Sequence, residues 1–195
     1  MRLSTRPLPA LFVAAALAAP ALASADTRYA GVAGGIWLPD SGGNVKSELD
    51  NGVAGELRLG WRVHRNFALE GAIGALQADA TLPPADVIET TLHSVSSTYV
   101  LLSGWAFLPL GDDAWRLGAG AGLGYYSADL KAKDPPPAGE QRASETDTGF
   151  HFGAAVRYAV TDKYGIGLEY RFVSVSPGDV DIDGAAAMLA GDYHF

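Results

Sequence analysis

The sequence predicts an all-β protein: a single domain that forms an eight-stranded, antiparallel, up-and-down β-barrel. Three observations predict this fold. Apolar residues alternate with small or charged residues through most of the chain, which is the period-2 pattern of strands with two different faces. Short and long connections also alternate along the chain, as in a sheet with one tight rim and one loop-rich rim. The alternation continues to Phe195, although the ends of soluble domains are usually polar and frayed.

Five segments alternate clearly and predict strands. They are residues 53–62, 67–75, 115–125, 150–158 and 164–172. Residues 29–38, 95–107 and 185–195 complete the eight strands with mixed or weak alternation. Periodicity alone does not orient the side chains of residues 29–38 and 95–107, so the facing of these two strands stays open.

The predicted connections have two lengths. Short links lie at residues 64–66, 109–113 and 161–163, and long ones at residues 39–50, 77–93, 129–147 and 174–183. The longest connection contains "KAKDPPPAGEQRASETD". It is rich in proline and charge, so we expect a mobile loop there.

The first 25 residues predict a secretory signal peptide. Arg2 and Arg6 precede an apolar run over residues 8–22, and the small residues "ASA" end at Ala25. A positive start, a short apolar centre and a small-residue cleavage site are typical of such peptides. The apolar centre is shorter than the roughly 20 residues of a membrane-spanning helix. We therefore expect a signal peptide over residues 1–25 and the barrel over residues 26–195.

Composition excludes several classes of function. The chain has 22 acidic and 14 basic residues, a net charge of −8, so we expect no nucleic-acid partner. It has no cysteine, which rules out disulfides and thiol catalysis. The sequence shows neither a phosphate-binding loop nor a zinc-ligand cluster, and we expect no cofactor.

The charged face distinguishes two kinds of eight-stranded barrel. A soluble ligand-binding barrel turns its apolar face inward, whereas a membrane barrel turns it outward and tolerates a polar interior. The small face of the predicted strands combines glycine and alanine with charged residues: Glu56, Arg58, Glu70, Arg116, Arg157, Glu169 and Arg171. Such a face suits the narrow interior of a membrane barrel, which side chains of limited volume must fill.

Aromatic residues on the opposite face support the membrane barrel. Towards the tight rim lie Trp61, Phe67, Phe107, Trp115, Tyr158, Tyr164, Tyr193 and Phe195, and towards the loop rim lie Tyr125, Phe150 and Phe172. Aliphatic residues separate the two groups. Aromatic girdles that flank an aliphatic band are typical of transmembrane β-barrels. The sequence therefore predicts a transmembrane barrel whose last strand pairs with its first, because no backbone group can stay unpaired in lipid.

With its signal peptide, its eight strands and the ending "YHF", the chain resembles small outer-membrane β-barrels of the OmpA/OmpX/OmpW type. The resemblance implies a location in the outer membrane of a Gram-negative cell, with both mature termini periplasmic. It also implies contact with outer-membrane lipid and lipopolysaccharide, and recognition by the outer-membrane assembly machinery. In that family the terminal aromatic residues are the assembly signal, which here corresponds to Tyr193 and Phe195.

The charged residues of the small face are expected to form an ion-pair network in the lumen. If residues 63–65 form the turn, Arg58 lies directly opposite Glu70. The same construction brings Arg157 near Glu169. These pairs either fill and pin a narrow lumen or form a gate that opens a small pore.

Two further motifs give weaker indications. Asp179, Asp181 and Asp183 resemble the start of an EF-hand loop, but Ala190 stands where that motif needs glutamate. We expect no dedicated metal site, although the acidic loops are able to bind divalent cations loosely. His93 precedes serines at 94, 96 and 97. This spacing shows no serine–histidine pair with an orienting third group, so we expect no enzyme.

The expected function is a non-enzymatic barrel with a structural or surface-interaction role. The alternative is a narrow channel for small or apolar solutes, as OmpW-type proteins are thought to form. An enzyme that modifies the acyl chains of lipid A is the third possibility.

Overall fold

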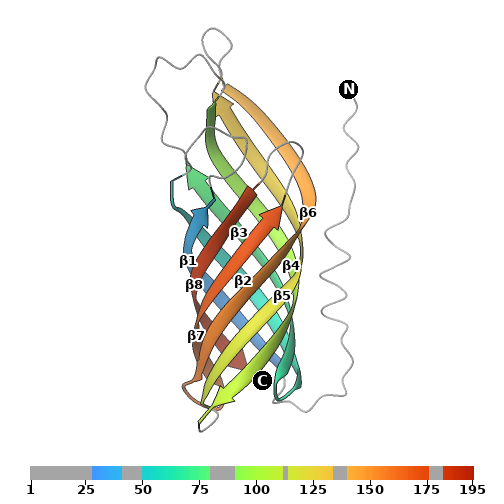
Figure 1. Ribbon diagram of the computed structural model, residues 1–195, viewed down its shortest axis with the longest axis vertical. Helices are drawn as coiled ribbons and strands as arrows, with labels where there is room; N and C mark the ends of the chain where they lie inside the picture. Colours follow the sequence, from blue (N-terminus) through green and yellow to red (C-terminus); the bar gives the residue numbers. More distant parts are fainter. Residues whose placement is uncertain (1–27, 41–49, 80–90, 112–113, 134–139, 176–181) are drawn as a thin grey trace.

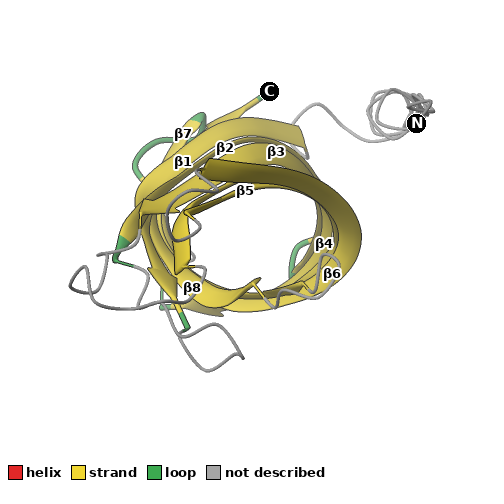
Figure 2. Ribbon diagram, turned by 90° about the horizontal axis from the view of Figure 1, so that it is seen from above, coloured by secondary structure: helices red, strands yellow, loops and turns green. Residues whose placement is uncertain are grey.

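The computed structural model describes residues 28–40, 50–79, 91–111, 114–133, 140–175 and 182–195, and these form a closed antiparallel barrel (Figures 1 and 2). The predicted fold is thereby confirmed. The eight strands are β1 (Arg28–Pro39), β2 (Gly52–His64), β3 (Phe67–Asp79), β4 (Thr91–Leu110), β5 (Trp115–Lys133), β6 (Glu140–Ala159), β7 (Tyr164–Val175) and β8 (Ile182–His194). Within the described part of the chain, no helix is long and apolar enough to cross a membrane.

The barrel closes between its first and last strands. β1 pairs with β8 from Tyr29 opposite His194 to Pro39 opposite Gly184. Beyond this ladder, the backbone N–H of Phe195 donates a hydrogen bond of 3.0 Å to the carbonyl oxygen of Arg28. The sheet therefore has no free edge along this seam, which is what a barrel in lipid requires.

The barrel has two different ends. We call the end with the connections β2–β3, β4–β5 and β6–β7 the turn end, and the opposite end, where the other connections lie, the loop end. Figure 1 shows the chain terminus marked C at the turn end. The two ends therefore match the predicted tight and loop-rich rims.

The structure orients the two strands that the sequence left open. In β1, Tyr29, Ala33 and Trp37 are buried and face the lumen, while Val32 and Ile36 are exposed. In β4 the buried, inward-facing series is Val95, Ser97, Tyr99, Leu101, Ser103, Trp105 and Phe107. The placement of Phe107 in the outer aromatic girdle was therefore wrong.

Phe107 faces inward because the lumen at the turn end holds a small apolar cluster. Its ring stacks on Trp105 with centroids 6.0 Å apart. Gly118 on β5 leaves room for it, since a Cβ at that position would lie 2.6 Å from the Phe107 ring. A larger apolar cluster fills the loop end of the lumen, where Trp37, Leu76 and Tyr126 are buried.

The longest predicted loop is largely strand. β5 and β6 pair continuously from Trp115 opposite Tyr158 to Lys133 opposite Glu140. The connection predicted over residues 129–147 therefore shrinks to residues 134–139, which lie outside the described residues. Polar strands form here because β5 finds hydrogen-bonding partners on both sides, on β4 and β6.

Candidate functional site

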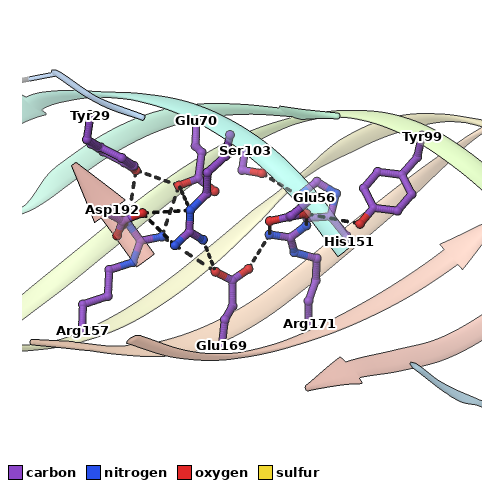
Figure 3. Close-up of polar contacts among 11 residues, drawn as sticks. Tyr29, Glu56, Glu70, Tyr99, Ser103, His151, Arg157, Glu169, Arg171 and Asp192 are labelled. Atoms are coloured by element: carbon purple, nitrogen blue, oxygen red, sulfur yellow. Dashed lines mark hydrogen bonds and ion pairs between the residues drawn. The ribbon is translucent and has the colours of Figure 1, made fainter. Parts of the chain in front are cut away.

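The candidate site is a network of arginines and carboxylates in the lumen, between the two apolar clusters. Figure 3 shows its polar contacts. Arg58 of β2 lies at its centre. Its Nε and Nη2 atoms donate hydrogen bonds of 3.0 and 2.9 Å to Asp192 Oδ1 on β8. Its Nη1 atom donates one of 2.9 Å to Glu169 Oε2 on β7. One guanidinium thus joins three strands across the interior.

Arg171 extends the network towards the loop end. Its Nη1 and Nη2 atoms form a bidentate contact with Glu56: Nη1 donates to Oε2 at 2.7 Å and Nη2 donates to Oε1 at 3.1 Å. Nη2 also donates to Glu169 Oε1, so Glu169 bridges Arg58 and Arg171. The Tyr99 hydroxyl donates to Glu56 Oε2 at 3.3 Å. Bidentate arginine–carboxylate contacts are among the strongest and most directional polar contacts in proteins.

Arg157 extends the network towards the turn end. Its Nη2 atom lies 3.2 Å from Glu70 Oε2, and the Tyr29 hydroxyl donates to the same oxygen at 2.7 Å. The guanidinium carbon lies 5.0 Å from the ring centroid of Phe107 and 5.5 Å from those of Tyr29 and Trp105. Aromatic faces at this distance attract a cation, so Arg157 is held by both a carboxylate and three rings.

The structure brings six of the seven predicted network residues into contact. The seventh, Arg116, faces the lumen at the turn end but forms no ion pair with the residues that the structure describes, and its Nη1 atom has no hydrogen-bond partner among them. Arg157 and Glu169 do approach each other, with Nη2 and Oε2 3.8 Å apart.

The predicted register of β2 and β3 was wrong by two residues. Arg58 pairs with Ala72, and Glu70 pairs with Gly60. The register shifts between Arg62 and His64, an irregularity that the expected three-residue turn did not include. Arg58 and Glu70 still meet diagonally, because Nε and Oε2 are 3.9 Å apart. The main partner of Glu70 is Arg157.

Sequence reasoning missed Asp192, Tyr29 and Tyr99 as members of the network. For Asp192 a signal existed: with Tyr193 and Phe195 facing outward, the alternation places Asp192 inward. The tyrosines gave no such signal, because their hydroxyl groups reach carboxylates on β2 and β3 only through the stagger of the closed barrel.

The serine–histidine contact in the structure is not the one the sequence suggested. Ser96 and Ser97 lie on opposite faces of β4, and the side chain of His93 is outside the described residues. Instead, Ser103 Oγ and His151 Nε2 are 2.8 Å apart within the lumen wall, and both residues are buried. His151 Nδ1 has no partner among the described residues, so no third group orients this pair as a catalytic triad requires.

Of the three aspartates that resemble the start of an EF-hand loop, only Asp183 lies among the described residues. Asp179 and Asp181 lie outside the described residues. Asp183 stands near the start of β8, where its carbonyl oxygen accepts a 2.8 Å hydrogen bond from the N–H of Asp40. Among the described residues, no group of three or more histidine, cysteine or acidic side chains is placed to hold a metal.

The distribution of polarity defines the class of protein. Charged groups lie inside, whereas the outer surface exposes large apolar side chains; Leu123 is 70% exposed and Leu189 is 69% exposed. A soluble barrel would bury such residues, but a transmembrane barrel presents them to lipid. The molecule is therefore a membrane-spanning β-barrel.

The chain belongs to the family described as outer membrane protein beta-barrel domain, which it matches over residues 10–195. This places it among the outer-membrane barrels of Gram-negative cells. No curated protein matches the chain.

Solved structures share the fold at low sequence identity. Neisserial surface protein A superposes with a TM-score of 0.60 and 14% identity, covering 87% of this chain and 97% of that one. OprG from Pseudomonas aeruginosa gives a TM-score of 0.59 with 13% identity, and the same two shares are covered, 87% and 97%. Ail, the attachment invasion locus protein of Yersinia pestis, gives 0.55 and 13%, covering 87% and 99%.

Proposed function

We propose that this protein is a closed outer-membrane barrel with a structural and surface-presenting role, and that it does not conduct ions. The turn end and both mature termini then face the periplasm, and the loop end faces the outer surface, amid lipopolysaccharide. The observation that carries the proposal is the arginine–carboxylate network. It spans the lumen with side chains from β2, β3, β6, β7 and β8.

The energetics of the network favour a permanently closed lumen. Arg58 and its carboxylate partners Glu169 and Asp192 have side chains at most 3% exposed. Opening a pore would separate these charges, and breaking a buried pair costs about 3–5 kcal/mol. Glu169 accepts hydrogen bonds from two arginines. A change in the rotamer of one side chain therefore does not open a path through the lumen. Several contacts would have to break together.

The long strands support a surface-presenting role. The pairing of β3 with β4 ends at Asp79 opposite Ser94, and that of β6 with β7 ends at Phe150 opposite Ser174. The pairing of β5 with β6 continues beyond these points to Lys133 and Glu140. β4, β5 and β6 thus form a three-stranded extension at the loop end (Figure 1), which would present a surface to molecules outside the cell.

Planar-bilayer recording tests the proposal. The wild-type barrel is expected to give no resolved single-channel steps. The double variant Arg58→Ser with Glu169→Ser removes one charge of each sign from the network and is expected to give measurable leak events. Discrete steps from the wild type would contradict a closed lumen and favour the channel alternative.

The alternative function, a passage for small apolar solutes, would need an entrance at the loop end of the lumen. The loop end of the lumen contains a small pocket whose lining is mostly apolar, with Trp37, Leu76, Tyr99, Leu101, Tyr126, Val173 and Met188 among its residues. If apolar solutes enter there, adding one should change the fluorescence of Trp37. The change should disappear in Trp37→Phe, whereas Trp115→Phe, on the outer surface, should retain it.

A further inference from the structure

Two arginines at the turn end of the lumen stand apart from the network. Arg62 continues the inward-facing series of β2 after Arg58 and Gly60. Arg116 begins the inward-facing series of β5 and pairs in register with Arg157 of β6. Both side chains are partly exposed, so they are within reach of solutes at the turn end.

Neither arginine has a carboxylate partner among the described residues. The charges that act on Arg62 include two arginines that repel it, Arg116 and Arg157, and one carboxylate, Asp192, that Arg58 already holds. Arginine does not relieve this repulsion by losing its proton in proteins. Two like charges that repel each other at the turn end of the lumen favour the binding of a counter-charge.

Unsatisfied hydrogen-bond donors point to the same place. The Nε atom of Arg62 and the Nη1 atom of Arg116 are buried, and neither has an acceptor in the described part of the chain. Buried polar atoms are nearly always satisfied by protein or by a bound species. A bound oxyanion would supply both the missing acceptors and a negative charge between two arginines that repel each other.

Aromatic rings line part of the lumen at the turn end. One inward-facing position deeper than Arg116, the ring of Phe107 packs over Gly118. Arg157 lies over the rings of Phe107 and Trp105. Such an apolar lining lowers the local dielectric and strengthens electrostatic interactions there.

We propose that Arg62 and Arg116 together bind one small oxyanion of the phosphate type at the turn end of the lumen. A guanidinium presents N–H groups in a planar fork that matches two oxygens of such an anion, whereas a chloride ion uses one position only. Free phosphate is the favoured source, because both side chains face the lumen and not the lipid. A phospholipid headgroup that reaches into the mouth offers the same chemistry.

Side-chain NMR of the folded, ¹⁵N-labelled protein in maltoside micelles tests the site without any phosphate from detergent. Sodium phosphate is titrated against sodium chloride at equal ionic strength. The Nε–Hε signals of Arg62 and Arg116 are expected to shift and saturate with phosphate only. Arg65, which is exposed in the neighbouring turn, is the internal control and should not saturate.

Two variants and a measurement in lipid nanodiscs test the proposal further. Arg62→Gln and Arg116→Gln should each weaken phosphate binding at least about tenfold, as the loss of a charge-assisted hydrogen bond predicts, whereas Arg65→Gln should leave it unchanged. If both signals already lie at their phosphate-bound positions in phosphatidylcholine nanodiscs, the bound oxyanion is a lipid phosphate. Equal shifts with chloride and phosphate, or an equal response at Arg65, would overturn the proposal.

Discussion

At the scale of single residues, the interior depends on how large charged side chains fit beside very small neighbours. A Cβ at Gly31 would lie 2.3 Å from Asp192 Oδ1 and 2.9 Å from Arg58 Nε. The glycine thus leaves the space in which this ion pair forms. Buried charges are tolerated only when they are paired and hydrogen-bonded, and glycine is what makes such pairing sterically possible in a narrow barrel.

Glu70 is the residue at which this balance is most easily tested. Glu70→Ala removes the carboxylate that contacts Arg157 and accepts the Tyr29 hydroxyl hydrogen bond. Because this leaves buried donors and a buried charge without their partner, the free energy of unfolding is expected to fall by about 3–5 kcal/mol. Urea unfolding measures the loss as a lower midpoint.

The control for this variant is Glu145→Ala, at an exposed position of β6. It should change the unfolding midpoint little, since exposed ion pairs contribute about 0–1 kcal/mol. Equal losses for the two variants would mean that Glu70 is no better paired than a surface residue.

The sequence identified the inward-facing charges but not all of their partners. Alternation alone placed Glu56, Arg58 and Arg171 on one face, because a strand has a strict period of two. Which charges form pairs depends on the register of adjacent strands and on the stagger of the barrel. One irregular turn shifts the register of β2 and β3 by two residues from the expected one. Glu70 therefore meets Arg157 as its main partner, although it was expected opposite Arg58.

At the scale of strands, the seam between β1 and β8 depends on close backbone approach. A Cβ at Gly35 would lie 1.9 Å from the carbonyl oxygen of Ala187 and 2.7 Å from the Cα atom of Met188. Both contacts are with backbone, which cannot move without disturbing the ladder. The neighbouring Gly34 faces outward, and its Cβ would meet nothing closer than 3.8 Å.

Gly35→Ala is therefore expected to destabilise the folded barrel by about 1–3 kcal/mol, the usual cost of overpacking. Gly34→Ala, one residue away on the same strand, should be close to neutral. Unfolding in urea of the two variants side by side checks the difference. Similar midpoints would show that the seam relaxes more readily than these distances imply.

Strand lengths were the least predictable feature of the elements. Composition predicted a loop over residues 129–147 because the segment is rich in proline and charge. The structure extends β5 to Lys133 and starts β6 at Glu140, since hydrogen bonding between adjacent strands stabilises polar segments that have no apolar face. The strand segments at the level of the membrane were easier to predict from the sequence, because lipid requires an apolar residue at every second position.

At the scale of the whole molecule, closure and orientation join the fold to its place in the membrane. Tyr193 is 40% exposed and Phe195 is 51% exposed. Both lie at the turn end beside Tyr164, whose ring centroid is 5.3 Å from that of Tyr193. These rings form part of an aromatic girdle, which positions a barrel at the membrane interface. The terminal residue also completes the β1–β8 seam through its backbone.

Deleting Phe195, or changing it to Asp, is expected to reduce the amount of barrel in the outer membrane strongly. The deletion removes an interfacial ring and also the hydrogen bond to the Arg28 carbonyl oxygen, and an unpaired backbone group near lipid costs several kcal/mol. If the terminal aromatic residues also serve as the assembly signal, the precursor should accumulate in the periplasm and be degraded. Cell fractionation measures the amount, and the migration of unheated samples on detergent gels measures the folded fraction.

Phe67→Asp separates the two roles of the terminal ring. Phe67 lies at the turn end and is 53% exposed, so its replacement weakens the girdle without touching the terminus. A girdle effect alone predicts equal losses for Phe67→Asp and Phe195→Asp. An assembly signal predicts that Phe195→Asp accumulates in the periplasm while Phe67→Asp still reaches the outer membrane in reduced amount. Normal levels of the Phe195 deletion in the outer membrane would contradict both roles, because neither the girdle nor assembly would then depend on this residue.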